Sequence, residues 1–120
     1  MKEERTQKEL AREIAEAAAR ILDAKKGVDV TTLEVGAQTV LADYFVLATG
    51  TSNTHVRALA DEAEFKLNEE LGVKPGHIEG GDGNSWILLD YGCVVIHVFT
   101  AQGREFYKLE RLWKDAGAQE

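Results

Sequence analysis

The histidines and the single cysteine of this chain are the side chains that could bind a transition metal or serve a nucleophilic enzyme. Cys93 and His97 fall on one side of an expected strand, but four residues of extended chain separate them by about 13 Å. Zinc requires its ligands within about 2.0 to 2.3 Å of one point, and His55 and His77 add no ligand-spacing motif. Cys93 has no adjacent base in the sequence, and no G-x-S-x-G pattern occurs. We therefore expect neither a metal site nor nucleophilic catalysis.

The stretch TGTSNTHVRALADE, residues 49–62, could receive a phosphate group, because an expected strand runs into small polar residues and then a helix. A nucleotidyltransferase or a phosphate-handling hydrolase would use residues 51–54 together with Asp61. Nucleotidyltransferases, however, hold magnesium with two carboxylates at alternate positions of a strand. Asp61 and Glu62 are adjacent in an expected helix and point about 100° apart. We interpret the stretch as an ordinary helix N-cap and retain the enzyme as an alternative.

The stretch WILLDYGCVVIHVF, residues 86–99, is apolar at most positions and turns in the middle, which predicts a β-hairpin. A two-residue turn at Tyr91 and Gly92 would pair Asp90 with Cys93. Side chains alternate between the two faces of a strand, so the hairpin has two different faces. The first face is purely aliphatic and comprises Ile87, Leu89, Val94, Ile96 and Val98. The second face mixes apolar and polar groups and comprises Trp86, Leu88, Asp90, Cys93, Val95 and His97.

These two faces lead to different expectations. The aliphatic face is expected to seat amphipathic helices. The mixture of an aromatic anchor with a few polar groups on the second face is typical of the core of a protein interface. Alternatively, a helix near the C-terminus covers the second face, and His97 is a core histidine whose hydrogen bonds are satisfied.

The chain has 120 residues, which fits one domain spanning residues 1–120 and suffices for a hydrophobic core. Its formal net charge is −7 and no cluster of Lys or Arg occurs, so we expect no direct sequence-specific contact with nucleic acid. The acidity suits a basic protein partner, or serves solubility alone. One cysteine permits no internal disulfide, and no run of residues is typical of a membrane span or a targeting segment. We therefore expect a cytoplasmic protein.

The elements that position these residues follow from apolar periodicity and from turn residues. Apolar residues at helical spacing predict a first helix ended by Gly27 and a second helix ended by Gly72. The expected boundaries are a helix at 6–25, a strand at 28–35, a strand from 44, a helix after 51–54, a short strand at 77–79, the hairpin, and a helix at 104–113. This order predicts an α/β (α+β) domain with helices packed on a small mixed β-sheet of about five strands.

Three segments in this order, DYFVLATGTSNTHVRALADE, WILLDYGCVVIHVF and REFYKLERLW, resemble the ribosomal silencing factor family (RsfS, also called Iojap) over about residues 10–113. The resemblance implies a fold related to nucleotidyltransferases but without their catalytic carboxylates, with no cofactor and no enzymatic activity. It implies a translation inhibitor that binds the large ribosomal subunit through large-subunit ribosomal protein fourteen. Binding there blocks joining of the small subunit when nutrients are short. Members are often homodimers when free, and a large-subunit assembly factor that uses the same site is an alternative.

The partner-binding motif of the family maps onto the hairpin. Trp86 and Leu88 would supply apolar anchors, and Asp90 would meet Lys or Arg on a basic ribosomal protein. The family usually has Asp directly after the Tyr-Gly turn, where this chain has Cys93. Losing an exposed ion pair there costs under about 1 kcal/mol, and losing a buried one costs several times more. The candidates for partner binding, including two secondary ones from the last helix, are Trp86, Leu88, Asp90, Tyr91, Gly92, Cys93, Val95, His97, Tyr107 and Glu110.

Overall fold

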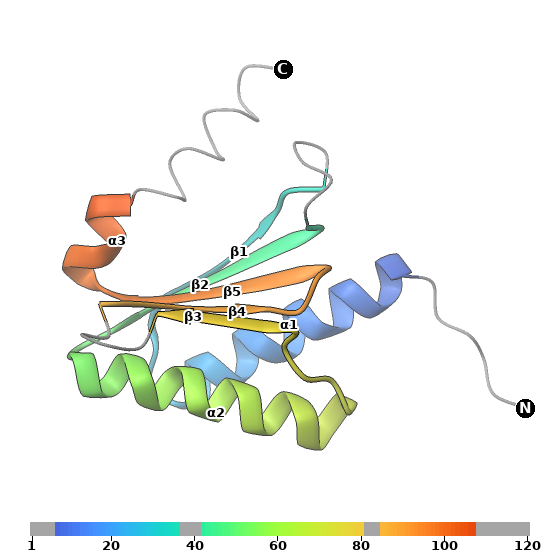
Figure 1. Ribbon diagram of the computed structural model, residues 1–120, viewed down its shortest axis with the longest axis horizontal. Coiled ribbons are helices and arrows are strands. Elements are labelled where there is room, and N and C mark those ends of the chain that lie inside the picture. The colour runs from blue at the N-terminus through green and yellow to red at the C-terminus, as the bar shows by residue number, and fades with distance from the viewer. Residues whose placement is uncertain (1–6, 37–41, 81–84, 108–120) are drawn as a thin grey trace, which may run out of the picture.

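The computed structural model describes residues 7–36, 42–80 and 85–107, and its elements follow the expected order (Figure 1). Within that part, helices pack on one mixed five-stranded sheet, so the predicted α/β fold is confirmed. None of the described helices is both long and apolar enough to cross a membrane. The elements are α1 Gln7–Ala24, β1 Val28–Glu34, β2 Tyr44–Gly50, α2 Asn53–Leu71, β3 His77–Gly80, β4 Trp86–Asp90, β5 Val94–Thr100 and α3 Ala101–Tyr107.

The two ends of α2 are set by side-chain and backbone caps. Ser52 is the N-cap, and its hydroxyl oxygen accepts a hydrogen bond from the N–H of His55 at 3.1 Å. Gly72 ends the helix with φ 70°, and its N–H donates to the carbonyl of Asn68 at 2.9 Å. Between the caps, the buried apolar residues recur at helical spacing and are Val56, Leu59, Ala60, Ala63 and Leu67. The sequence predicted both ends of this helix and its buried side.

The strands lie in the order β1-β2-β5-β4-β3. β2 and β5 are parallel, and the other neighbouring pairs are antiparallel. Both parallel strands are internal, which agrees with the continuous apolar run that begins β2. α1 and α2 cover one face of the sheet, whereas α3 lies at one end of the opposite face (Figure 1).

Alternate residues of the strands point toward α1 and α2 and form what we call the helix-side core. Its strand residues are Val46, Ala48, Ile87, Leu89, Val94, Ile96 and Val98. Each of them is at most 1% exposed, so the prediction that the aliphatic face of the hairpin seats the helices is confirmed. Burial of one side chain of this size contributes about 1.5 to 3 kcal/mol, so this layer supplies much of the stability of the sheet.

The hairpin turn lies one residue later than predicted. Gly92 and Cys93 form the turn, which is closed by a 2.8 Å hydrogen bond from the N–H of Tyr91 to the carbonyl of Val94. The predicted pairing of Asp90 with Cys93 is therefore wrong, because Cys93 belongs to the turn. The physical reason is that Gly92 adopts φ 87° at the first turn position, a conformation that glycine tolerates and tyrosine disfavours. The partner of each β4 residue shifts by two positions, so the strand residues keep their predicted faces.

α3 begins earlier than predicted. Its first residue is Ala101 rather than residue 104, because the hydroxyl of Thr100 accepts a hydrogen bond from the N–H of Gly103 at 3.1 Å. The predicted helical residues 108–113 lie outside the described residues.

Candidate protein interface

Half of the ten predicted binding residues come together on the sheet face opposite α1 and α2. We call this surface the mixed face, and it comprises Phe45, Leu47, Trp86, Leu88, Asp90, Val95, His97 and Phe99. In the observed register, Trp86 lies opposite Phe99 and Leu88 lies opposite His97. Because β2 runs beside β5, Phe45 and Leu47 join the same face from the other side of β5.

Burial is uneven across the mixed face. Leu47 and Phe99 are fully buried, and His97 is 4% exposed. The remaining residues, which are half-buried, are Phe45, Trp86, Leu88, Asp90 and Val95. Apolar side chains therefore stay partly accessible on the side of the sheet that α1 and α2 do not cover.

The described residues of α3 lie over one end of the mixed face. The guanidinium of Arg104 donates to the hydroxyls of Thr49 at 2.9 Å and Thr31 at 3.1 Å. Its central carbon lies 5.8 Å from the ring centre of Phe99, close enough for a cation–π contact. These contacts fix α3 over the ends of β2 and β5. The alternative in which a helix near the C-terminus covers the whole face concerns residues 104–113, and residues 108–113 lie outside the described part of the chain.

His97 and Trp86 form the polar centre of the mixed face. The indole N–H of Trp86 donates to Nδ1 of His97 at 3.2 Å, and the two ring planes differ by 4°. Burial lowers the pKa of His97 to about 4, against an opposing effect of the Asp90 charge, so the imidazole is neutral at pH 7. An acceptor at Nδ1 requires the proton on Nε2. Nε2 is buried and has no hydrogen-bond partner among the described residues, so His97 is not a fully satisfied core histidine there.

Asp90 has a structural contact as well as its predicted binding role. Its Oδ1 accepts a hydrogen bond from the N–H of Gly92 at 2.8 Å and so stabilises the hairpin turn. The side chain is half-buried at the turn end of the mixed face. Gly92 itself is exposed in the turn. A carboxylate in this place can serve the turn and present negative charge to a partner.

Two predicted binding residues pack on the other side of the sheet. Tyr91 packs against the helix-side core, and burial, with a smaller effect of Glu64, raises its pKa to about 12. Cys93 was expected on the mixed face, but it also packs against the helix-side core, and burial raises the pKa of its thiol. The prediction of a mixed-face Cys93 is wrong, because the turn rotates this residue out of the strand alternation. Its carbonyl accepts N–H groups of Asp43 at 2.8 Å and Tyr44 at 3.2 Å.

The two secondary candidates near the C-terminus are not placed. Tyr107 is the last residue of α3, and its side chain lies outside the described part of the chain. Glu110 lies outside the described residues altogether.

Sequence reasoning missed three residues of the mixed face. Phe99 belongs to it because the observed register places this ring opposite Trp86. Phe45 and Leu47 belong to it because β2 and β5 are parallel neighbours. The alternation of β2 could have grouped Phe45 with Leu47, but no local signal identifies β5 as the neighbour of β2.

The start of α2 satisfies its own polar groups. The N–H of Thr51 donates to Nδ1 of His55 at 2.9 Å, and Nε2 of His55 lies 3.1 Å from the carbonyl of Lys25. Together with the Ser52 cap, these contacts engage the N–H groups of Thr51 and His55. Ser52 is therefore an N-cap, as the sequence predicted.

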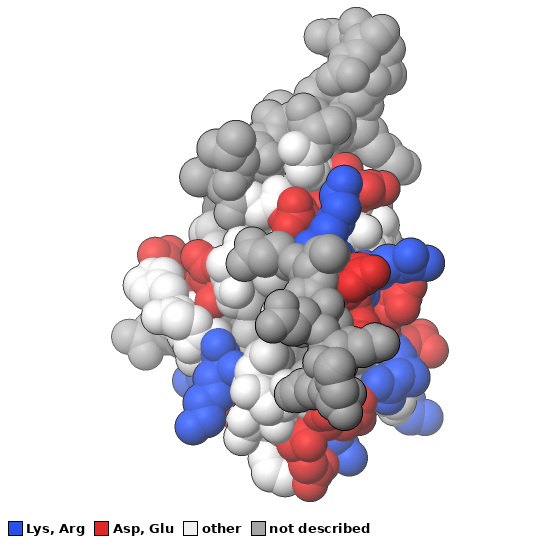
Figure 2. All heavy atoms as spheres, turned by 90° about the vertical axis from the view of Figure 1, so that its right-hand side faces the viewer, with Lys and Arg blue, Asp and Glu red and all other residues white. Residues whose placement is uncertain are grey.

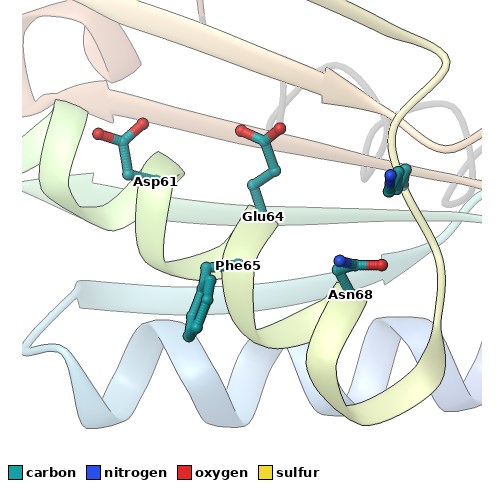
Figure 3. A pocket seen from close by; sticks show the side chains of 5 residues that line it. Asp61, Glu64, Phe65 and Asn68 are labelled. Carbon is teal, nitrogen blue, oxygen red and sulfur yellow. The ribbon is translucent and has the colours of Figure 1, made fainter.

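A shallow depression of about 380 Å³ lies along α2, away from the mixed face (Figure 3). It is lined by Asp61, Glu64, Phe65, Asn68 and Lys74. The Phe65 side chain is 59% exposed, since this residue falls outside the buried stripe of α2. Among the described residues, no group of three or more His, Cys, Asp or Glu side chains is arranged to hold a metal ion.

Charged side chains of both signs are interspersed at the end of the molecule that Figure 2 shows. Arg12 forms an ion pair with Glu16 at 3.2 Å, and Arg20 forms one with Glu70 at 2.6 Å. The hydrogen bond to Arg20 lowers the pKa of Glu70. Among the described residues that Figure 2 shows, Lys and Arg side chains alternate with Asp and Glu and do not gather into a basic patch of the kind that binds a phosphate backbone.

The fold and the mixed face place this chain among small α/β proteins whose long helices lie on one side of the sheet. Residues 8–120 match the family described as ribosomal silencing factor during starvation. The chain is 38% identical over 103 residues to the ribosomal silencing factor RsfS of Bacillus subtilis, a match that covers 86% of each protein. The chain therefore belongs to the ribosomal silencing factor family.

Two further similarities extend this result. A mouse protein named mitochondrial assembly of ribosomal large subunit protein 1 is 34% identical over 90 residues, which cover 71% of this chain and 38% of that protein. A crystal structure of a protein from Chromobacterium violaceum is similar with a TM-score of 0.82 and 38% identity. That match covers 87% of this chain and 86% of the solved one.

Proposed function

We propose that this protein is a non-enzymatic translation inhibitor in the cytoplasm. It binds the large ribosomal subunit through large-subunit ribosomal protein fourteen and sterically blocks joining of the small subunit. The observation that carries the proposal is that Trp86 and Leu88 stay partly exposed on a sheet face that α1 and α2 leave open. Membership in the ribosomal silencing factor family supports the ribosome as the partner.

The chemistry of the mixed face suits a basic protein partner. Trp86, Leu88 and Val95 offer apolar area, and aromatic anchors of this kind dominate the binding energy of protein interfaces. Asp90 adds negative charge at the turn end, and the chain as a whole carries a formal charge of −7. Complementary charge steers association with a basic protein and fixes its orientation.

Steric obstruction is sufficient for inhibition. A standard interface buries about 800 Å² on each partner, which a sheet face of this kind can supply. A chain of 120 residues held at the joint between two subunits then occupies space that the small subunit needs. No bond is made or broken.

Subunit joining in vitro tests this proposal. Purified small and large subunits are mixed with initiation components, and full ribosomes are quantified on a sucrose gradient at increasing protein concentration. We expect the wild type to reduce full ribosomes when it is preincubated with large subunits and to have less effect when it is preincubated with small subunits. Trp86→Ala should leave joining intact. Equal inhibition by wild type and a folded Trp86→Ala variant would refute the mixed face as the binding surface.

The name of the mouse relative favours a second candidate function, assembly of the large subunit through the same contact. Depletion of the protein in its own cells distinguishes the two functions. Accumulation of immature large subunits would favour assembly. Normal large subunits with excessive translation during nutrient shortage would favour silencing.

A further inference from the structure

The hydrogen bond between Trp86 and His97 joins a surface residue to a buried one. The Trp86 side chain is half-buried, whereas that of His97 is 4% exposed. The indole N–H donates to Nδ1 of His97 at 3.2 Å, and the two ring planes are within 4° of parallel. A single hydrogen bond in this geometry restricts both side-chain torsions of the tryptophan.

His97 is itself held on several sides. Its backbone lies on β5, between Leu47 of β2 and Leu88 of β4. The ring centre of Phe45 lies 5.0 Å away with the planes at 64°, and that of Phe99 lies 6.4 Å away with the planes at 21°. A rigid imidazole is thus available to orient a more exposed neighbour.

The cost of this arrangement points to a role beyond packing. The buried Nε2 of His97 has no hydrogen-bond partner among the described residues, and a buried donor without a partner destabilises the folded state. An aliphatic residue in the same position would avoid that cost, as Val98 and Ile96 do on the neighbouring positions. What His97 provides and an aliphatic residue cannot is the acceptor for the Trp86 indole.

We infer that His97 is a positioning residue, which does not contact the partner but fixes the Trp86 indole in the orientation that the partner binds. This inference rests on the proposed function, because it assigns Trp86 to the interface. It also defines the partner group that packs on the indole. The indole N–H is already donated to His97, so that group is apolar or cationic, such as an aliphatic side chain or the stem of Lys or Arg, and not a hydrogen-bond acceptor.

The expected loss of affinity follows from the entropy cost of ordering the Trp86 side chain on binding when His97 no longer holds it in place. Immobilising one side chain at an interface weakens affinity by about two- to tenfold. Loss of the His97 acceptor should therefore weaken binding by this factor, far less than truncation of Trp86 to alanine.

Two substitutions distinguish the hydrogen-bond acceptor of His97 from the volume that its imidazole ring fills. His97→Leu removes the acceptor, and His97→Asn retains one at a position similar to Nδ1. The first readout needs no ribosome: the indole N–H signal of Trp86 in a proton–nitrogen correlation spectrum, assigned with Trp86→Phe. We expect His97→Leu to move this signal and to speed its exchange with water, and His97→Asn to restore both.

The second readout is affinity for purified large ribosomal subunits, measured beside urea unfolding of each variant. We expect two- to tenfold weaker binding for His97→Leu and near wild-type binding for His97→Asn. Trp86→Phe leaves His97 in place, but the phenylalanine ring has no N–H to donate. The affinity of this variant for the large subunit should therefore also fall by about two- to tenfold, and this test holds even if His97→Leu folds poorly. Unchanged indole exchange in His97→Leu, or wild-type affinity of Trp86→Phe, would overturn the inference. Wild-type affinity of Trp86→Ala would instead refute the proposed binding face, and the positioning role with it.

Discussion

The two faces of the sheet are built from alternate residues of the same strands, yet they differ in burial and in composition. On β4, Ile87 and Leu89 of the helix-side core are 1% exposed, whereas Trp86, Leu88 and Asp90 of the mixed face are half-buried. The helix-side core is aliphatic, and the mixed face combines aromatic rings, a histidine and a carboxylate. Adjacent residues of one strand therefore have different surroundings, since α1 and α2 close one face and the other face stays partly accessible.

The largest effect on stability is expected from a comparison of two leucines that are neighbours in the sequence. Leu89→Ala should destabilise the protein by about 2 to 5 kcal/mol, because it opens a cavity in a layer closed by α1 and α2. Leu88→Ala should cost roughly 1 kcal/mol, because the side chain is only partly removed from water in the wild type. Urea unfolding of both variants measures the difference. Equal losses would contradict the division of the sheet into a stabilising face and a binding face.

The pH dependence of stability tests the burial of His97. His97 takes up a proton near pH 6.5 in the unfolded chain and near pH 4 in the folded protein, because burial lowers its pKa. Between these values the unfolded state binds more protons, so the stability contribution of neutral His97 is complete above about pH 6.5 and is lost as the pH falls to 4. The loss amounts to about 3 kcal/mol over that window.

Urea unfolding at pH 7 and at pH 4.5 measures this loss, with His97→Leu as the matched control. The wild type should lose more stability on acidification than the variant does, because both share every other titrating group. A pH dependence that is the same in the two proteins would show that His97 does not titrate as the buried site requires.

Asp90 allows its charge to be separated from its turn contact. Asp90→Asn retains an oxygen that can accept the Gly92 N–H, so its stability should stay within about 0.5 kcal/mol of the wild type. Its affinity for the large subunit should fall by under about 1 kcal/mol, and the difference should shrink at high salt. Asp90→Ala should add a loss of about 0.5 to 1.5 kcal/mol in stability. A salt-independent affinity difference between the wild type and Asp90→Asn would argue against a charge contact.

The smallest expected effect lies in the depression on α2. Phe65 is 59% exposed there, so Phe65→Gln should change stability by under about 1 kcal/mol and leave ribosome binding unchanged. Binding measured beside the mixed-face variants checks this. If Phe65→Gln lost as much affinity for the large subunit as Leu88→Ala does, the interface would lie on the helix side of the sheet.

Local signals in the sequence predicted much of the fold. The Ser52 and Gly72 caps bound α2 as expected, and strand alternation assigned Ile87 and Leu89 to the core and Trp86 to the other face. These features depend on residues close in the sequence, which is why they could be predicted.

The rest depended on conformation or on distant pairing. The turn was misplaced because the choice between Tyr91 and Gly92 for its first position rests on a positive φ, which glycine adopts more readily. Cys93 left the mixed face for the same reason. The neighbours Phe45 and Leu47 were missed because the parallel pairing of β2 with β5 joins segments separated by the whole of α2 and two strands.

Co-sedimentation with separated ribosomal subunits tests the central claim most directly. Wild type, Trp86→Ala and Phe65→Gln are each titrated with purified large and small subunits after their folding has been verified by urea unfolding. We predict that wild type and Phe65→Gln sediment with the large subunit only, and that Trp86→Ala binds at least about 30-fold more weakly. Binding of Trp86→Ala equal to that of the wild type, or no binding of the wild type to the large subunit, would contradict the assignment of the mixed face as a ribosome-binding surface.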